Sequence, residues 1–371
     1  MKPIYMDNAA STKISPEVLA KFNEVAENLY GNPSSMHTEG ILAKACIDET
    51  KKYISSKINC LDDELYFTSG ATMSNNILIQ GVLRRHPETM FVTSTVEHND
   101  IMELYDWLPY SKYMVEVNRD GQINMNSLWN ILIDCERSNK PCLVSVQMAN
   151  SETGIIQPIK QISSLVHEYG GYLHVDATQY IPYFNINVKD MGIDALSMSG
   201  QKIGGIKGSG LLYVRTSLLK NMTSIIFGEQ GLIGGTPSTP LIASLGEAFK
   251  NMDCDVSELH DKTSTLLSSL QDMGGKLVGT EVNRLPNNIY IRFPGIKGLT
   301  LMSLLSERGI YIGTGSACST DSDKPSHVAL AYGLSEDEAL ECIRFTLCND
   351  NTYEEIEYVV KVLNSILSLL R

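Results

Sequence analysis

The chain has 371 residues, of which 43% are hydrophobic and 20% charged, and its formal net charge is −13. This composition is typical of a folded globular protein and excludes a disordered one, while the length predicts about two domains. The negative charge argues against direct nucleic-acid binding, which needs a basic surface. Neither an apolar leader nor a run of roughly 18 apolar residues is present, so we expect a cytoplasmic protein without membrane contact.

Eight cysteines are scattered along the chain, and no two of them have C-x-x-C spacing. A disulfide framework or a structural zinc site in a chain of this length would show closer and more regular spacing. We therefore expect reduced thiols and no metal.

From about residue 60 to residue 249, short apolar runs alternate with longer amphipathic stretches. In chain order, the expected strands are Glu64–Thr68, Met90–Thr93, Tyr113–Val117, Cys142–Gln147, Tyr172–Val175, Ala195–Met198 and Gly210–Val214. The expected helices between them are Thr72–Leu83, Asp100–Leu108, Met125–Cys135 and Pro158–Tyr169. This alternation predicts an α/β fold in which helices cover both faces of a mostly parallel sheet.

The pattern changes after residue 250. A long helix at Val256–Met273 is followed by strands near Lys276–Gly279 and Asn288–Arg292, and then by helices to the end of the chain, including Tyr353–Leu370. This order of elements is typical of a smaller α+β unit. We predict a large α/β domain over residues 12–250 and a small α+β domain formed by residues 1–11 and 251–371.

One segment, residues 65–76, runs from a strand through small residues into a helix. It contains Ser69, Gly70, Ala71 and Thr72 at the junction. Such a junction directs unpaired backbone N–H groups and the positive helix end at one point, which suits a phosphate. Small residues also serve as ordinary helix caps, so this segment alone leaves both interpretations open.

Two further chain segments place polar residues at the ends of expected strands. Asp176 follows one buried strand, and Lys202 follows the next. Ligands of open α/β sheets bind at this edge. Pyridoxal phosphate (PLP) needs a lysine for its Schiff base, an acid for its ring nitrogen and an anchor for its phosphate. The three segments together therefore predict a PLP site.

Cys318 lies in the polar, glycine-rich stretch of residues 313–323 and has almost no apolar neighbours in sequence. Structural cysteines are usually buried among hydrophobic residues. The context of Cys318 therefore indicates an exposed, reactive thiol, whereas the other seven cysteines lie mostly in apolar or helical contexts.

Together these segments resemble the cysteine desulfurases, class V members of the aminotransferase superfamily of PLP enzymes with fold type I. The resemblance covers nearly the whole chain in order. Four of its motifs are the segments described above: residues 65–76, which we call the phosphate cradle, and the segments with Asp176, Lys202 and Cys318. The others are residues 5–12, 31–37, 97–98, 150–154, 235–236 and 343–345.

The resemblance implies the catalytic residues Cys318, Lys202 and His98. It also implies a PLP site made of Ala71, Thr72, His98, Ser151, Asp176, Gln179, Ser199, Gln201, Lys202 and, across a homodimer interface, Thr236. It implies a substrate site made of Asn32 and Arg344.

Each of five residues has a specific implied role. Lys202 would hold PLP covalently, and Asp176 would pair with the ring nitrogen. His98 would stack on the ring and transfer protons, while Arg344 would bind the carboxylate of L-cysteine. Cys318 would take the substrate sulfur as a persulfide, release L-alanine and pass the sulfur to an acceptor protein.

Four positions depart from the family pattern. Gln201 stands where a histidine is usual, Ser151 replaces an asparagine, Met73 replaces an acid and Ile233 replaces an arginine. Each loss would weaken cofactor anchoring by about 1 kcal/mol, the scale of one hydrogen bond. These departures keep two alternatives open. One is a related PLP enzyme acting on selenocysteine or another amino acid, and the other is a slow PLP-binding scaffold in a sulfur-transfer complex.

Overall fold

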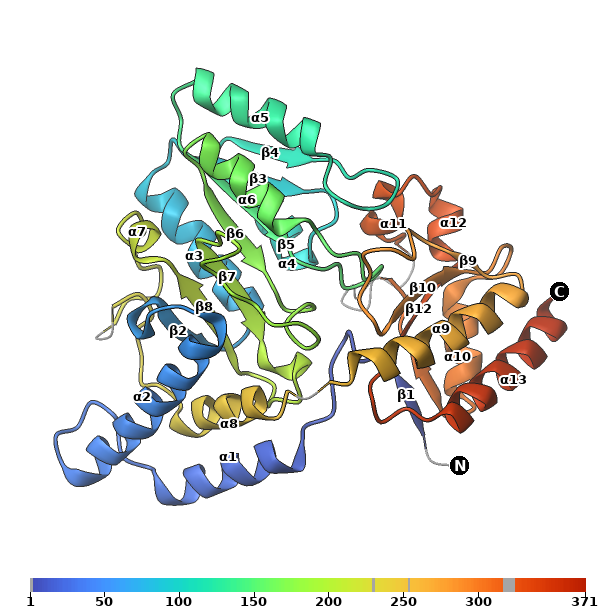
Figure 1. Ribbon diagram of the computed structural model, residues 1–371, viewed down its shortest axis with the longest axis horizontal. Coiled ribbons are helices and arrows are strands. Elements are labelled where there is room, and N and C mark those ends of the chain that lie inside the picture. The colour runs from blue at the N-terminus through green and yellow to red at the C-terminus, as the bar shows by residue number, and fades with distance from the viewer. Residues whose placement is uncertain (1–2, 229–230, 253, 316–323) are drawn as a thin grey trace.

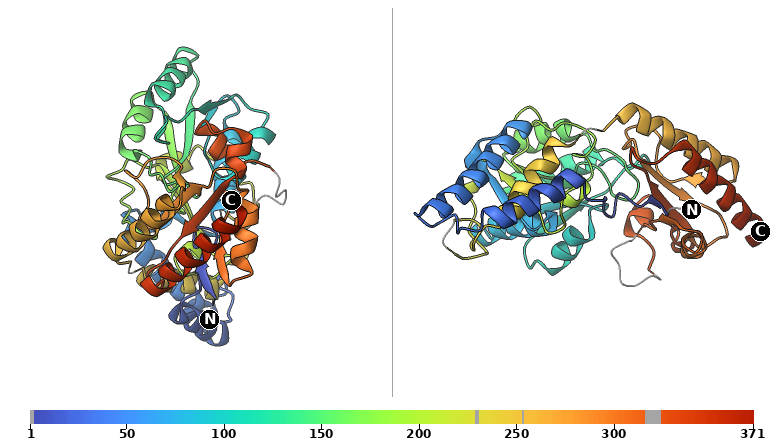
Figure 2. Two further views of the ribbon diagram at one scale, coloured as in Figure 1. Left: turned by 90° about the vertical axis from the view of Figure 1, so that its right-hand side faces the viewer. Right: turned by 90° about the horizontal axis from the view of Figure 1, so that it is seen from below.

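The computed structural model describes residues 3–228, 231–252, 254–315 and 324–371. Two groups of elements lie side by side in it, a larger one with a central sheet and a smaller one that carries both ends of the chain (Figures 1 and 2). No helix within these ranges is both long enough and apolar enough to cross a membrane.

The larger group is built on a seven-stranded sheet with the order β2-β8-β7-β6-β5-β3-β4. Its strands are β2 (Leu65–Thr68), β3 (Met90–Ser94), β4 (Lys112–Val115), β5 (Cys142–Gln147), β6 (Tyr172–Asp176), β7 (Ala195–Ser199) and β8 (Gly210–Val214). Five neighbouring strands of the sheet are parallel to one another: β4, β3, β5, β6 and β7. Strand β8 is antiparallel to both β7 and β2. The predicted mostly parallel sheet is therefore confirmed.

Helices cover both faces of this sheet. They are α1 (Pro16–Asn28), α2 (Thr38–Ile58), α3 (Ala71–Arg85), α4 (Asn99–Trp107), α5 (Met125–Arg137), α6 (Ile159–Glu168), α7 (Thr216–Leu219) and α8 (Thr239–Lys250). Neighbouring residues of one strand belong to different cores: Phe91 packs with α3 and α4, and Val92 packs with α5 and α6. Strands buried on both faces have continuous apolar sequences, which explains why the sequence revealed them.

The smaller group has its own core. It contains an antiparallel sheet of β9 (Lys276–Leu277), β10 (Asn288–Arg292) and β12 (Cys342–Thr346), and the parallel pair of β1 (Ile4–Met6) and β11 (Ile310–Ile312). Its helices are α9 (Val256–Asp272), α10 (Gly298–Ser306), α11 (His327–Ala331), α12 (Glu336–Leu340) and α13 (Tyr353–Leu370). The domain boundaries after residues 11 and 250 stay a prediction, which the separate cores support.

The expectation that only helices follow Arg292 was wrong. The structure has two strands there, β11 and β12. Each is a run of only three to five residues, too short to be recognised as a strand by its own apolar pattern. Their strand conformation comes from pairing with β1 and β10, which lie far away in the sequence.

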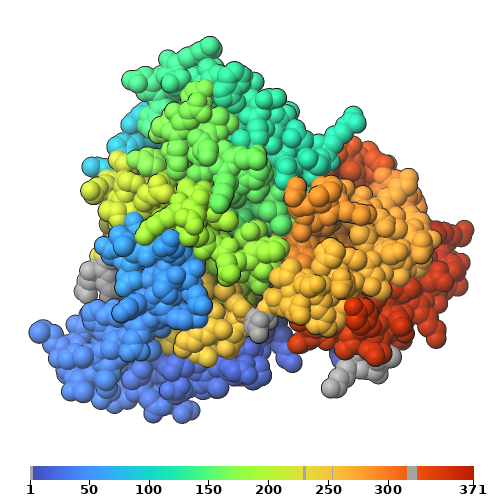
Figure 3. All heavy atoms as spheres, in the orientation of Figure 1, coloured from blue at the N-terminus to red at the C-terminus, as the bar shows by residue number. Residues whose placement is uncertain are grey.

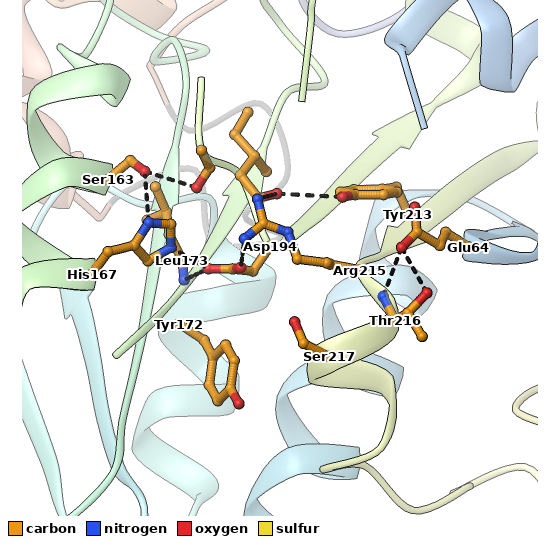
Figure 4. A network of polar contacts seen from close by, with 12 residues as sticks. Glu64, Ser163, His167, Tyr172, Leu173, Asp194, Tyr213, Arg215, Thr216 and Ser217 are labelled. Atoms are coloured by element: carbon orange, nitrogen blue, oxygen red, sulfur yellow. Dashed lines mark hydrogen bonds and ion pairs between the residues drawn. The ribbon is translucent and has the colours of Figure 1, made fainter. Parts of the chain in front are cut away.

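A polar cluster joins the strands at the sheet edge where β6 and β7 begin (Figure 4). The Asp194 carboxylate accepts hydrogen bonds from the backbone N–H of Leu173 at 2.9 Å and from His167 Nε2 at 2.7 Å, and it forms an ion pair with Arg215 Nη1 at 2.8 Å. The Asp194 side chain is 2% exposed. One buried carboxylate therefore links β6, β7, α6 and the end of β8.

We expect Asp194→Ala to lower the free energy of unfolding by about 3 kcal/mol, because it leaves a buried N–H, the His167 imidazole and the Arg215 guanidinium without their common acceptor. A urea titration measures this change. The matched control is Asp272→Ala, which removes an exposed carboxylate at the end of α9. A loss below about 0.5 kcal/mol, the size of an ordinary surface substitution, would contradict a stabilising role.

Candidate active site

A cavity of about 240 Å³ lies where the parallel strands end. Ten of the predicted site residues line it: Ala71, Thr72, His98, Ser151, Asp176, Gln179, Ser199, Gln201, Lys202 and Arg344. Most of them follow β2, β3, β5, β6 and β7, and Arg344 comes from β12 of the smaller group. The fold therefore brings together residues that are up to 273 positions apart in the sequence.

The start of α3 forms one wall of this cavity. The Ala71 N–H donates to Ser199 Oγ at 2.8 Å, which joins the first turn of α3 to the end of β7. Gly70 has φ +150°, and a Cβ on Gly210 would lie 2.5 Å from the Cα of Gly70. A side chain at either position would push the helix start away. The geometry fits the predicted phosphate cradle.

Asp176 ends β6, and its side chain is nearly buried. Its carboxylate accepts the Thr178 N–H at 3.0 Å and the Asn75 Nδ2 at 3.2 Å. Burial and the nearby negative charge of Asp100 raise the pKa of Asp176 above its usual value. If PLP were bound with its protonated ring nitrogen beside Asp176, the pKa of Asp176 would fall again, because an opposite charge favours the ionised carboxylate.

Lys202 lies in the short turn of residues 200–202 that follows β7. Its Nζ donates to the carbonyl oxygens of Ala9 and Ala10, each at 2.6 Å. Gln179 Nε2 donates to the same Ala9 carbonyl at 2.9 Å. The chain just after β1 therefore holds the lysine amine at the cavity wall.

His98 is the N-cap of α4, and its ring is partly exposed toward the cavity. His98 Nδ1 lies 2.7 Å from Asp100 Oδ1. Asp100 was not among the predicted site residues. Its place two positions after a histidine was the only available signal, and only the turn into α4 brings the two side chains together.

Arg344 is held from two sides within the cavity wall. Its Nη2 pairs with Asp7 Oδ1 at 2.6 Å, and its Nη1 donates to the Ser151 carbonyl at 3.0 Å. The guanidinium is 3% exposed, and its Nε has no hydrogen-bond partner within the described part of the chain. A substrate carboxylate would satisfy this buried donor.

Sequence reasoning also missed two polar residues of the cavity, Glu152 and His327. Burial raises the pKa of Glu152 to about 7, although a 2.6 Å hydrogen bond from Ser326 and the charge of Arg344 oppose the shift. His327 Nε2 lies 2.9 Å from the Glu97 carbonyl oxygen. Glu152 lies within the 150–154 motif, which drew attention to Ser151 alone, whereas His327 follows no expected strand and had no signal in the sequence.

Two predicted residues lie outside this cavity, and a third cannot be located. Asn32 and Thr236 are exposed and do not line the cavity of their own chain. Cys318 lies outside the described residues, so the predictions about its surroundings and its reactivity stay predictions. Gly315, three positions earlier, does line the cavity.

Ser151 is one of the four departures from the family pattern, and the asparagine beside it, Asn150, has a different structural role. Asn150 Nδ2 donates to the Val96 carbonyl at 2.9 Å, and its Oδ1 accepts the N–H groups of Glu152 and Thr153. Asn150 therefore supports the turn and is not among the residues that line the cavity. Ser151 borders the cavity in its place.

The residues around the cavity fit PLP. A helix start suits the phosphate, a carboxylate at a strand end suits the ring nitrogen, and a lysine amine lies at the same cavity. Two buried polar atoms on its wall, Arg344 Nε and Thr178 Oγ1, have no partner among the described residues. They supply hydrogen-bonding capacity for a bound polar molecule.

The chain is similar to known proteins in both sequence and structure. Residues 4–359 match the model of the aminotransferase class V family. Cysteine desulfurase IscS of Clostridium botulinum (strain Hall) is 34% identical, over all of this chain and 96% of its own. A solved NifS-like protein has a TM-score of 0.89 at 29% identity, covering 99% of this chain and 100% of its own. A solved structure of SspA in complex with cysteine has a TM-score of 0.81 at 30% identity, covering 94% of this chain and 100% of its own.

Proposed function

The chain belongs to the aminotransferase class V family and, within it, to the cysteine desulfurases, and from this premise we propose that it transfers sulfur from L-cysteine to Cys318. One observation carries the proposal. Lys202, Asp176 and the phosphate cradle border a single cavity, and Gly315 lies on its wall. Three extended residues span at most about 11 Å, a length of chain that allows the thiol three positions after Gly315 to act at that cavity.

PLP, when bound, supplies an electron sink for bond cleavage next to the amino group. The chain's own residues would hold it. Lys202 would provide the covalent link, Asp176 would keep the ring nitrogen protonated, and the start of α3 with Ser199 would bind the phosphate. Gln179, Gln201 and Ser151 also line the cavity and would contact the rest of the cofactor.

Two residues would act on the substrate. The planar guanidinium of Arg344 binds the carboxylate of L-cysteine and orients it. The Cys318 thiolate attacks the substrate sulfur, so that an S–S bond forms while the Cβ–S bond breaks. Cβ gains a proton, L-alanine leaves, and the transferred sulfur stays on Cys318 as a persulfide. An acceptor protein then takes this sulfur.

Alanine release is the experiment that tests this function. The purified, PLP-loaded protein is incubated with L-cysteine, with and without a thiol reductant, and alanine and sulfide are quantified. We expect repeated turnover with reductant and about one alanine per chain without it, because the persulfide accumulates. PLP binding without alanine release would favour the alternative of a slow PLP-binding scaffold. Faster alanine release from selenocysteine than from L-cysteine would favour the alternative of an enzyme that acts on selenocysteine.

A homodimer forms part of this proposal. Of the apolar side chains that are more than two fifths exposed, six lie on two segments of the chain. They are Leu19, Tyr30, Met36, Ile41, Leu42 and Phe227. The first five belong to α1, α2 and their connection, which project from the molecule in Figure 3. Large exposed apolar groups mark interaction surfaces. Asn32 and Thr236 lie close in sequence to these residues, and we propose that they reach the partner's cavity.

We expect sedimentation to show a dimer and Met36→Asp to raise its dissociation constant at least about tenfold, since a buried charge costs more than 1.4 kcal/mol. Met36 is 94% exposed. The matched control is Leu369→Asp on α13, where the replaced side chain is 81% exposed. A PLP-loaded monomer would contradict the dimer, and equal effects of both variants would contradict this interface.

A further inference from the structure

We propose that Asp100 is a positioning residue that holds His98 in one tautomer, with Nδ1 protonated and Nε2 as the proton acceptor. The inference rests on the proposed function, in which His98 transfers protons. It adds a residue that neither the sequence pattern nor the predicted roles included.

The contact between the two side chains is short and sheltered. His98 Nδ1 lies 2.7 Å from Asp100 Oδ1, and the backbone N–H of Asp100 is directed at the same nitrogen from 3.3 Å. The Asp100 side chain is 8% exposed, whereas the His98 side chain is 40% exposed and borders the cavity. The edge of the imidazole with Nδ1 therefore faces a buried carboxylate.

The shorter of these two contacts, the one with the carboxylate, decides which nitrogen of His98 carries the proton. If Nδ1 accepted the Asp100 N–H, its lone pair would lie 2.7 Å from a carboxylate oxygen with no proton between them, which is repulsive. If Nδ1 carries a proton, the shorter contact becomes a charge-assisted hydrogen bond of ordinary length. The Nδ1–H form is then favoured, and Nε2 across the ring is the basic nitrogen.

The surroundings keep Asp100 charged and in place. Asn75 Nδ2 donates to Asp100 Oδ2 at 3.1 Å and also donates to Asp176. Burial raises the pKa of Asp100, but the hydrogen bonds and the charge of His98, together with hydrogen bonds from Thr72 and Asn75, hold that pKa below its usual value. Asp100 therefore remains a hydrogen-bond acceptor at neutral pH.

This arrangement defines what each nitrogen does during turnover. Nε2 accepts a proton, and the imidazolium that results keeps its Nδ1–H on Asp100 until Nε2 releases the proton again. The carboxylate orients the ring and stabilises its charged form without taking the proton itself, which is how acid–histidine pairs raise reaction rates.

Nitrogen-15 NMR of protein labelled at histidine reads the tautomer directly, and it does not require turnover. The cofactor-free wild type is compared with Asp100→Ala and Asp100→Asn, and His98→Gln assigns the signal. We expect an Nδ1–H tautomer in the wild type, its loss in Asp100→Ala and its recovery in Asp100→Asn, because the amide oxygen of asparagine can still accept the bond.

Steady-state kinetics of alanine release provides the second readout. We expect Asp100→Ala to lower kcat about 10²-fold while the KM for L-cysteine changes less than about twofold, because the Asp100 carboxylate is bonded to His98 and Asn75 and the proposed substrate-carboxylate site is Arg344. Asp100→Asn should recover part of kcat. Asp106→Ala, which removes an exposed carboxylate from the same helix, should match the wild type.

An Nδ1–H signal that persists in Asp100→Ala, or an unchanged kcat in that variant, would overturn the proposal. An equal loss of kcat in Asp100→Ala and Asp106→Ala would also overturn it, since general destabilisation of α4 would explain both. If the wild type releases no alanine, the proposed function fails by itself, and the NMR comparison still decides whether Asp100 sets the tautomer.

Discussion

Lys202→Ala should lose the covalent attachment of PLP and slow alanine release from L-cysteine by at least about 10³-fold. The Lys202 amine lies at the cavity wall, 2.6 Å from each of two backbone carbonyl oxygens. Alanine in its place leaves no amine there to form the link. The phosphate cradle and Asp176 remain, so the variant should still bind PLP noncovalently and more weakly.

Absorbance in the visible range and mass spectrometry after borohydride reduction measure the covalent link. The matched control is Lys207→Ala, which removes an exposed lysine five positions along the same segment. We expect the control to keep both the adduct and the wild-type rate. A reducible PLP adduct in Lys202→Ala would show that another lysine carries the cofactor.

Cys318→Ser should keep the fold and the PLP spectrum but stop the transfer of sulfur. A hydroxyl oxygen cannot form a stable persulfide, so the substrate sulfur has no acceptor and L-alanine is not released. The wild type, treated with L-cysteine, should gain one sulfur on the peptide that contains Cys318, and a reductant should remove it. Mass spectrometry of that peptide and the alanine assay measure both effects.

Cys60→Ser is the matched control for the thiol. Burial raises the pKa of Cys60 to about 12, so this thiol stays protonated at neutral pH and is a poor nucleophile. Alanine release by Cys60→Ser should equal that of the wild type. If Cys318→Ser turned over L-cysteine normally, the persulfide mechanism would be wrong even with PLP bound to Lys202.

The five inner strands of the central sheet could be predicted because they are buried, or nearly so, on both faces. Burial on both faces requires a continuous apolar run such as Cys142–Gln147, and such a run is visible without any tertiary information. Strand β12 is also buried along its length, but it was missed because Arg344 interrupts its apolar run and its conformation depends on pairing with β10.

The sequence by itself determined which residues end the parallel strands. Asp176 and Lys202 are found there because local apolar periodicity locates the strands, and a polar residue after a buried strand is conspicuous. Only the tertiary structure showed that Asp100, from a helix start, and Glu152, from a turn, also border the cavity. Arg344 was implied by the family resemblance, but long-range packing alone brings it from a distant strand to the others and sets the distances between these side chains. Those distances determine burial and charge, and therefore the chemistry of each group.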